Sequence, residues 1–193
     1  AYNSGLVELQ DASSQASILQ LSTDQNGPIL DYCAGGGGKA LALSAYLNKP
    51  IFAHDSNLLR MKDLPKRASR SGADIRIIKS HNLRNSYYGL VFCDAPCSGS
   101  GTWRRDPEGK WSITLRDYQK LLSLQENILR TAAQLVQAGG RLVYATCSVL
   151  KDENKTQIQK FLANSNEWVL EKEKLFMPNE LGDGFYFATL KKK

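Results

Sequence analysis

Short apolar runs alternate along the chain with longer segments whose apolar residues recur at helical spacing. Strands are predicted at residues 29–33, 50–54, 74–79, 90–93 and 141–145, with two later strands near 168–170 and 185–190. Helices are predicted at residues 39–47, 57–71, 121–136 and 152–163. Strands that alternate with helices are typical of a parallel sheet with helices on both faces, so the sequence predicts an α/β fold.

Two breaks in the helical segments are also predicted. Pro65 should kink or divide the segment 57–71, because proline removes a backbone donor from a helix. Gly139 and Gly140 should end the segment 121–136, since glycine favours the position that follows a helix. No internal repeat or long linker interrupts the pattern, which indicates one domain over residues 1–193.

Chemically unusual residues gather where the predicted strands end. The glycines 35–38 follow the first strand, Asp55 the second, Asp94 and Cys97 the fourth, and Cys147 the fifth. In an open α/β sheet, ligands bind beyond the carboxyl ends of the strands. We therefore expect these residues to surround one site.

The segment 33–39, CAGGGGK, permits a tight turn and close approach of a ligand to the backbone at a helix N-terminus. It does not match a phosphate loop, because Cys33 stands where the first glycine belongs and Ala40 replaces the Ser or Thr. A turn without a ligand is the alternative. Asp55 follows the second strand, where a carboxylate can accept hydrogen bonds from both ribose hydroxyls or can cap the next helix. Together with the glycine turn, ribose binding is favoured.

The chain has four cysteines, Cys33, Cys93, Cys97 and Cys147. It is too long and too poor in cysteine for a secreted disulfide scaffold, so free thiols in a reducing compartment are predicted. The cysteines lack the paired short spacings of a structural zinc site, and no metal is predicted. Cys147 precedes a predicted helix, whose N-terminus would stabilise a thiolate.

The formal net charge is +6, which is compatible with a polyanionic partner. Basic residues concentrate between Arg60 and Arg84, where only Asp63 and Asp74 oppose them. This segment is either a solvated helix face or a surface that contacts phosphates. No apolar run is long enough to span a bilayer and no secretory segment opens the chain, so a cytoplasmic protein without a membrane partner is predicted.

Two motifs carry a resemblance to a known family. Residues 94–102, DAPCSGSGT, and residues 145–148, ATCS, resemble the paired motifs of the Sun/Nop family of RNA (cytosine-5) methyltransferases. The resemblance covers nearly the whole chain, from Leu9 to Tyr186, and residues 103–111 resemble the bacterial ribosomal-RNA branch. It implies a Rossmann-like methyltransferase fold with a mostly parallel seven-stranded sheet, helices on both faces and an antiparallel C-terminal strand.

The resemblance also implies S-adenosylmethionine as cofactor. Its methionine end would be cradled by Cys33, Ala34, Gly35, Gly36, Gly37, Gly38 and Lys39. Asp55 would hold the ribose with Arg60 close by, and Asp94 would also border the cofactor. The family usually has Ala-Pro or Ala-Gly where this chain has Gly35-Gly36, and an Asp beside the adenine where the best match here is Asn82.

In the implied mechanism, the Cys147 thiolate adds to carbon 6 of cytosine, and carbon 5 then becomes a nucleophile for the methyl group. Asp94 would contact the ring nitrogen and the exocyclic amine, and would need a raised pKa to donate a proton there. Cys97 would assist the release of Cys147. The base must leave its stack, and Trp103 or the arginines of the loop 96–114 could hold its neighbours.

Two alternatives remain open at this point. A DNA cytosine-5 methyltransferase would use Cys97, in Pro-Cys, as its nucleophile. A non-catalytic scaffold would bind RNA without turnover. Ribosomal RNA is the favoured partner over transfer RNA and a monomer is favoured. The chain is expected to be a fragment that lacks an upstream RNA-binding region, because it begins without methionine where the family's catalytic domain starts.

Overall fold

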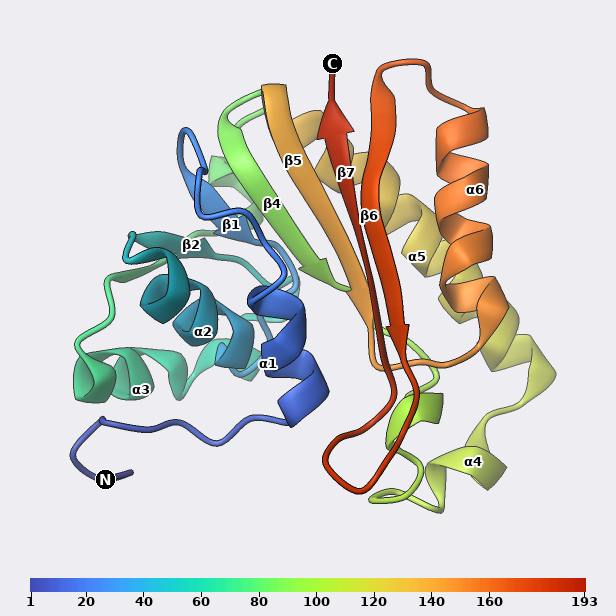
Figure 1. Cartoon of the computed structure of the whole chain (residues 1–193), viewed down its shortest axis with the longest axis horizontal. Helices are drawn as coiled ribbons and strands as arrows, with labels where there is room; N and C mark the ends of the chain where they lie inside the picture. Colours follow the sequence, from blue (N-terminus) through green and yellow to red (C-terminus); the bar gives the residue numbers. More distant parts are fainter.

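The computed structural model describes residues 1–193, and its central feature is a seven-stranded sheet (Figure 1). The strands are β1 (Ile29–Asp31), β2 (Ile51–Ala53), β3 (Ile75–Ile77), β4 (Tyr88–Asp94), β5 (Val136–Thr146), β6 (Trp168–Phe176) and β7 (Phe185–Lys192). Their order is β3-β2-β1-β4-β5-β7-β6. Strands β1 to β5 pair in parallel, and β7 is antiparallel to both β5 and β6. The predicted mostly parallel sheet with an antiparallel C-terminal strand is therefore confirmed.

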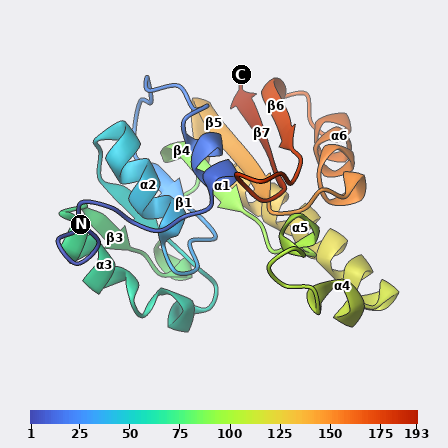
Figure 2. The same cartoon turned by 60° about the horizontal axis from the view of Figure 1, so that its bottom comes forward.

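Helices cover both faces of the sheet, as Figures 1 and 2 show. They are α1 (Ala12–Ile18), α2 (Gly38–Leu47), α3 (Leu64–Ser71), α4 (Gly109–Ser112), α5 (Leu115–Leu135) and α6 (Lys155–Ala163). Four 3₁₀ turns are η1 (Leu58–Met61), η2 (Ser80–Asn82), η3 (Ser100–Thr102) and η4 (Lys151–Glu153). No helix in the structure combines the length and apolar character needed to cross a bilayer.

Side chains of β4 divide between two hydrophobic cores because successive residues of a strand point to opposite faces. Leu90 and Phe92 pack with residues of α1, α2 and α3 on one face. Val91 and Cys93 pack with residues of α5 and α6 on the other. The short central strands are buried on both faces, which explains why their sequences are continuously apolar rather than alternating.

Helix boundaries differ from the predicted ones in two places. The segment 57–71 is divided as predicted, but Pro65 lies in the first turn of α3, where its missing donor breaks no helical bond. Gly139 and Gly140 do not end α5, so that prediction is wrong. The helix ends at Leu135 because Val136 is extended and pairs with Tyr88 of β4, while Gly139 adopts φ +70° inside β5.

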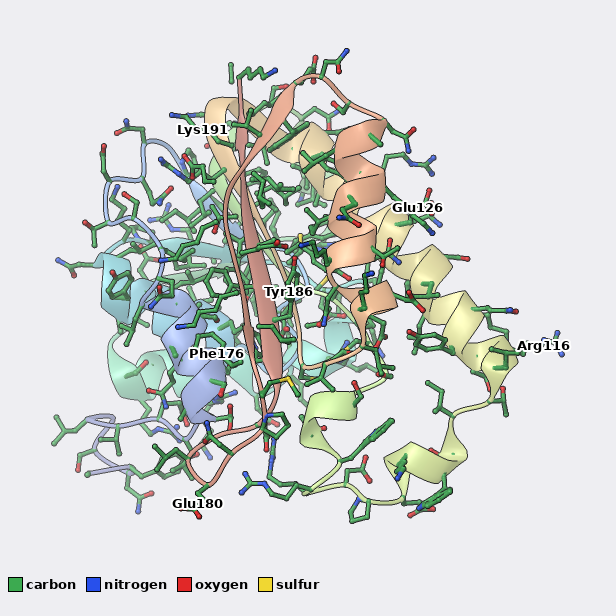
Figure 3. The ribbon with its side chains drawn as sticks, turned by 45° about the vertical axis from the view of Figure 1, so that its right-hand side comes forward. Arg116, Glu126, Phe176, Glu180, Tyr186 and Lys191 are labelled. Atoms are coloured by element: carbon green, nitrogen blue, oxygen red, sulfur yellow. The ribbon has the colours of Figure 1, made fainter.

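Two helices, α1 and α4, lie outside the predicted set. The first, α1, begins after Asp11, whose side chain accepts hydrogen bonds from the amides of Ser13 and Ser14. The second, α4, lies in the loop 96–114. In Figure 3, Arg116 at the start of α5 points away from the body of the protein, and Glu180 lies at the tip of the loop between β6 and β7. The loop 96–114 and the loop between β6 and β7 lie at the end of the sheet where β4 ends (Figure 1).

Candidate active site

A cavity of about 600 Å³ lies beyond the carboxyl ends of β1, β4 and β5. Ten of the predicted site residues line it: Cys33, Ala34, Gly35, Gly36, Gly38, Lys39, Arg60, Asp94, Cys97 and Cys147. They meet because parallel pairing aligns the strand ends, with Asp31 opposite Phe92 and Asp94 opposite Ala145. The structure thus brings together residues from four separate segments of the chain.

The glycine turn between β1 and α2 has a backbone that side chains would not tolerate. Gly35 and Gly37 have φ of +52° and +83°, in the left-handed region that favours glycine. A Cβ at Gly37 would lie 2.1 Å from a methyl carbon of Leu64 in α3. The turn therefore requires glycine at these positions for its own shape, and Gly35, Gly36 and Gly38 line the cavity.

Asp55, which follows β2, holds the glycine turn in place through a hydrogen bond. It is 4% exposed; its Oδ2 accepts a hydrogen bond from the Gly35 amide at 2.9 Å and its Oδ1 one from the Asn57 amide at 2.9 Å. Arg60 lies 3.5 Å from the same carboxylate. Asn57, and not Asp55, caps the following 3₁₀ turn, so the helix-cap alternative for Asp55 is wrong.

A second cavity of about 270 Å³ adjoins the first and shares Cys33, Arg60 and Pro96 with it. Asp55 lines this smaller cavity, and its far wall comes from Leu124 and Ile128 of α5. Asn82 lies in η2, is exposed, and lines neither cavity. The structure thus brings Asp55 to the site and leaves Asn82 outside it.

Lys39 and Asp94 form an ion pair at the floor of the larger cavity, with 2.6 Å between Nζ and Oδ2. Burial lowers the pKa of Lys39, but the carboxylates of Asp94 and Asp31 outweigh burial and raise it. The ammonium therefore stays charged and holds the Asp94 side chain. Asp31 lies beneath this pair, and burial together with the charge of Asp94 raises its pKa to about 7.

The thiols of Cys97 and Cys147 lie 3.4 Å apart, Sγ to Sγ. The hydrogen bond with Cys97 is the main cause that lowers the pKa of Cys147; burial and the Asp94 charge oppose it, and the Lys39 ammonium adds to the lowering. The same hydrogen bond, together with burial, raises the pKa of Cys97 strongly. The pair is therefore asymmetric: the shared hydrogen bond favours the thiolate form at Cys147 over that at Cys97.

The predicted cause of Cys147 acidity, a helix N-terminus, is wrong. The residues after Cys147 lead to η4 at Lys151, and α6 begins only at Lys155. The chain therefore leaves β5 through a loop, and no helix dipole is aimed at the sulfur. The second thiol and Lys39 supply the stabilisation instead.

Asp11 and Asp183 at the site escape prediction from the sequence, whereas Arg104 and Arg105 are among the loop arginines predicted to hold nucleotides beside the target base. Asp183, in the loop between β6 and β7, is 2% exposed and pairs with Arg104 and Arg105 of the loop 96–114. Its amide also donates to Asp11 at 3.0 Å, which joins three segments at the rim of the cavity. In the sequence, Asp11 and Asp183 are ordinary charged residues, and no local pattern indicates that they meet.

The aromatic residues of the loop 96–114 differ in exposure. Trp103 is partly buried and its indole Nε1 lies away from the surface, whereas Trp111 on α4 is 80% exposed with Lys110 over its ring. Trp111 is therefore the freer of the two to contact a partner.

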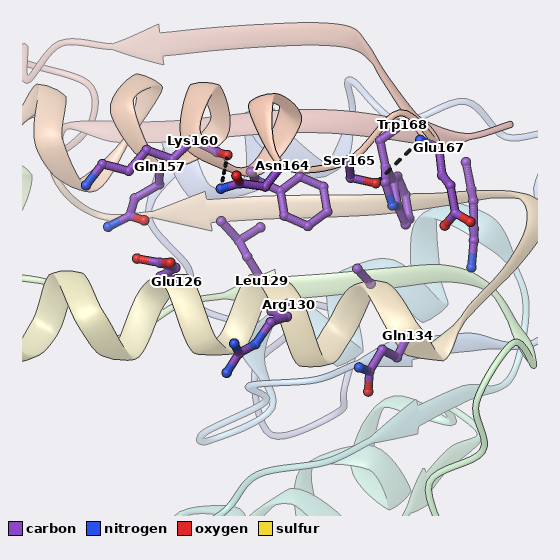
Figure 4. Close-up of a pocket in the computed structure, with 13 residues that line it drawn as sticks. Glu126, Leu129, Arg130, Gln134, Gln157, Lys160, Asn164, Ser165, Glu167 and Trp168 are labelled. Atoms are coloured by element: carbon purple, nitrogen blue, oxygen red, sulfur yellow. Dashed lines mark hydrogen bonds between the residues drawn. The ribbon is translucent and has the colours of Figure 1, made fainter.

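A third hollow lies between α5 and α6, on the opposite side of the sheet from the glycine turn (Figure 4). Leu129, Phe161 and Trp168 form its apolar wall, and Gln157 and Lys160 its polar rim. None of the predicted site residues lines this hollow. It is therefore separate from the candidate active site.

The sheet order and the cavity at its strand ends define a Rossmann-like methyltransferase, and solved structures agree. The crystal structure of PH0851 superposes with a TM-score of 0.92 and 29% identity, over 100% of this chain and 48% of that one. NSun6 from Pyrococcus horikoshii, solved with SFG, gives a TM-score of 0.82 and 23% identity, over 100% of this chain and 54% of that one.

Residues 16–191 match the family described as 16S rRNA methyltransferase RsmB/F, and the chain belongs to this family. The resemblance found in the two cysteine motifs is thereby confirmed. Ribosomal RNA small subunit methyltransferase B of Proteus mirabilis is 33% identical over 100% of this chain and 47% of its own length, and that of Escherichia coli O6:K15:H31 is 34% identical over 100% and 48%. The chain spans about half the length of these relatives. Methyltransferases of this family use S-adenosylmethionine.

Proposed function

We propose that this chain transfers a methyl group from S-adenosylmethionine to carbon 5 of a cytosine in RNA, through a covalent adduct with Cys147. The observation that carries the proposal is the contact of the Cys97 and Cys147 thiols, 3.4 Å apart, in one cavity with Asp94 and the glycine turn. The family description and the names of the relatives refer to ribosomal RNA, which supports it over transfer RNA as the substrate.

The two adjoining cavities fit S-adenosylmethionine. The turn 33–39 offers open backbone for the amino-acid end, and Asp55 has lone pairs left for ribose hydroxyls after its two backbone hydrogen bonds. The smaller cavity, between Pro96 and the α5 residues Leu124 and Ile128, has apolar walls suited to an adenine. When bound, the cofactor supplies an electrophilic methyl group.

Cys147 acts as the nucleophile in this proposal. Carbon 5 of cytosine is too electron-poor to take a methyl group directly, so a thiolate must first add at carbon 6 and turn the ring into an enamine. A lowered pKa favours the required thiolate form of Cys147, because the Cys97 thiol and the Lys39 ammonium both stabilise its charge.

Asp94 and Lys39 orient the cytosine. Their ion pair is an arrangement for a charged carboxylate, which accepts a hydrogen bond from the exocyclic amine. The Lys39 ammonium, 13% exposed, lies where it can stabilise negative charge that develops on the ring during the attack. This role differs from the proton donation expected from the sequence.

Cys97 acts after the methyl transfer. Its pKa is raised mainly by the hydrogen bond to Cys147. Once Cys147 is bound to carbon 6 as a neutral thioether, this largest cause disappears, and the loss of the Cys97 proton to water is then opposed mainly by burial. Its thiolate then removes the proton from carbon 5, the carbon 6–sulfur bond breaks, and Cys147 leaves as a thiolate. One proton is released in each turnover.

Single substitutions test this division of roles. With RNA and S-adenosylmethionine, Cys97→Ala should accumulate a denaturation-resistant protein–RNA adduct, and Cys147→Ala should form none and lose turnover. Cys93→Ala, a change to a thiol buried in β4, serves as the control with normal turnover. If Cys147→Ala keeps full turnover and Cys97→Ala loses it on DNA, the protein is a DNA enzyme that uses Cys97. If calorimetry detects no binding of S-adenosylmethionine, the non-catalytic scaffold is supported.

A further inference from the structure

Glu153 is a completely buried carboxylate that lines none of the cavities described above. Its Oε1 accepts hydrogen bonds from the Ser98 amide at 2.8 Å and the Gln125 side chain at 2.9 Å. Its Oε2 accepts from the hydroxyls of Ser98 and Ser148, each at 2.5 Å. All four donors are neutral groups. A buried carboxylate is costly unless its hydrogen bonds are satisfied. Here four neutral donors satisfy them, without a basic residue to balance the charge.

The donors lie next to the two cysteines in the chain. Ser98 follows Cys97 and Ser148 follows Cys147, so a single side chain connects both loops. Gln125, on α5, also donates to the carbonyl of Pro96 at 2.9 Å, the residue before Cys97. The loop after β4 is therefore held on both sides of its cysteine.

Asn154, the next residue, completes the arrangement on the other loop. The Thr146 hydroxyl donates to its Oδ1 at 2.6 Å, and its Nδ2 donates to the Ser148 carbonyl at 2.8 Å. Thr146 and Ser148 are the two neighbours of Cys147. The residues on either side of both thiols are thus fixed by Glu153, Asn154 or Gln125, each of which is at most 2% exposed.

We propose that Glu153 is a positioning residue, which joins the two cysteine loops and sets the separation of the Cys97 and Cys147 thiols. Its carboxylate is hydrogen-bonded to Ser98 and Ser148 and to neither sulfur, so it acts through these two serines. Its negative charge adds to the hydrogen bond with Cys147 and to burial in raising the pKa of Cys97, which favours the thiol form. This inference rests on the proposed roles of the two cysteines.

Three substitutions separate geometry from charge. Glu153→Gln keeps the hydrogen bonds, because its amide oxygen can accept from Ser98 and Gln125 while its amide nitrogen donates to the two hydroxyls. Glu153→Ala removes the connection, and Glu153→Asp shortens the side chain by one methylene. Glu173→Ala is the matched control, because Glu173 on β6 also accepts a hydroxyl hydrogen bond, from Tyr186 at 2.8 Å.

The first measurement is the rate of adduct formation with RNA in the Cys97→Ala background. Glu153→Ala and Glu153→Asp should slow it by about 10- to 100-fold, as expected for a misplaced nucleophile. The affinity for S-adenosylmethionine should change by less than about 2-fold, because Glu153 lines neither cofactor cavity. Glu153→Gln and Glu173→Ala should stay within about 3-fold of the parent.

The second measurement does not depend on methyl transfer. Thiols 3.4 Å apart should form a disulfide quickly under a mild oxidant such as diamide, and peptide mass spectrometry reports the Cys97–Cys147 link. Glu153→Ala and Glu153→Asp should slow this link by at least about 10-fold, and Glu153→Gln should not. If Cys97→Ala forms no adduct but the disulfide rates follow this order, the proposed function fails while the positioning role stands.

Parental disulfide and adduct rates in a folded Glu153→Ala or Glu153→Asp protein would overturn the inference. If Glu153→Ala does not fold, Glu153→Asp carries the test, because it keeps a carboxylate near the same donors.

Discussion

Asp31 should make the protein less stable as the pH rises. Its carboxyl group is completely buried at the end of β1, and burial with the charge of Asp94 raises its pKa to about 7, from 3.8 in an unfolded chain. The unfolded state therefore releases this proton at lower pH than the folded state does. The cost to folding is absent below about pH 4, grows between pH 4 and 7, and is constant above that range.

The magnitude follows from the two pKa values. Each pH unit of difference corresponds to about 1.4 kcal/mol, which gives a cost of about 4 kcal/mol at pH 8. Asp31→Asn keeps the shape of the side chain and removes the charge. The titration between pH 5 and pH 7 spans about two pH units, so we expect the free energy of unfolding of this variant to exceed that of the parent by about 3 kcal/mol more at pH 8 than at pH 5.

Urea denaturation of both proteins at the two pH values measures this difference. Asp74→Asn is the control, because Asp74 is exposed and its hydrogen bond with Arg76 lowers its pKa. That variant should change stability little, and by the same amount at both pH values, because an exposed ion pair contributes little. The reasoning is refuted if Asp31→Asn shifts stability equally at pH 5 and pH 8, or if it is less stable than the parent at pH 8.

Three further predictions concern binding and reactivity. Asp55→Ala should weaken the binding of S-adenosylmethionine by at least about 10-fold in calorimetry, because the glycine turn loses a hydrogen bond and the ribose loses its acceptor. An unchanged affinity would contradict the assigned site. Lys39→Met removes a charge that, after the Cys97 hydrogen bond, lowers the pKa of Cys147. The pH below which adduct formation is lost should therefore be higher in this variant than in the parent. Superimposable pH profiles of the two proteins would disprove this role. Trp111→Ala should weaken RNA binding by about 5- to 10-fold in a filter assay, since an exposed indole can stack on a base. An equal loss in Trp103→Phe would argue against a specific role for Trp111.

Alternating strand and helix signals predicted a parallel α/β sheet and a site at its strand ends, whereas the antiparallel C-terminal strand was implied by the family resemblance. The apolar runs that end at Asp31 and Asp94 are central parallel strands, and parallel pairing brings their carboxyl ends together. For that reason Asp94, Cys97 and Cys147, far apart in sequence, could be assigned to one site. The two-sided burial of these strands produces the continuous apolar pattern that made them recognisable.

Contacts that depend on tertiary packing could not be predicted. Gly139 looked like a helix stop, but pairing of Val136 with Tyr88 ends α5 earlier, which local propensity does not encode. Cys147 was assigned a helix N-terminus, whereas its stabilisation comes from Cys97 and Lys39, which lie on other elements. Position along the chain indicated which residues meet at the site, but not which groups set their pKa values.

The loop after β4 contains more small polar residues than the proposed chemistry uses, and the contacts of Ser100 and Gly101 explain them. The Ser100 hydroxyl lies 2.8 Å from that of Ser148 and accepts a hydrogen bond from the Val149 amide at 3.0 Å. The Gly101 amide donates to the Cys147 carbonyl at 2.9 Å, and a Cβ at Gly101 would lie 2.2 Å from the Gly184 carbonyl oxygen. A larger residue at 101 would therefore push the loop away from Gly184, which precedes β7, and disturb the hydrogen bond to Cys147. Because β4 and β5 pair only as far as Asp94 and Ala145, these loop contacts and Glu153 must hold the two sulfurs together beyond the sheet.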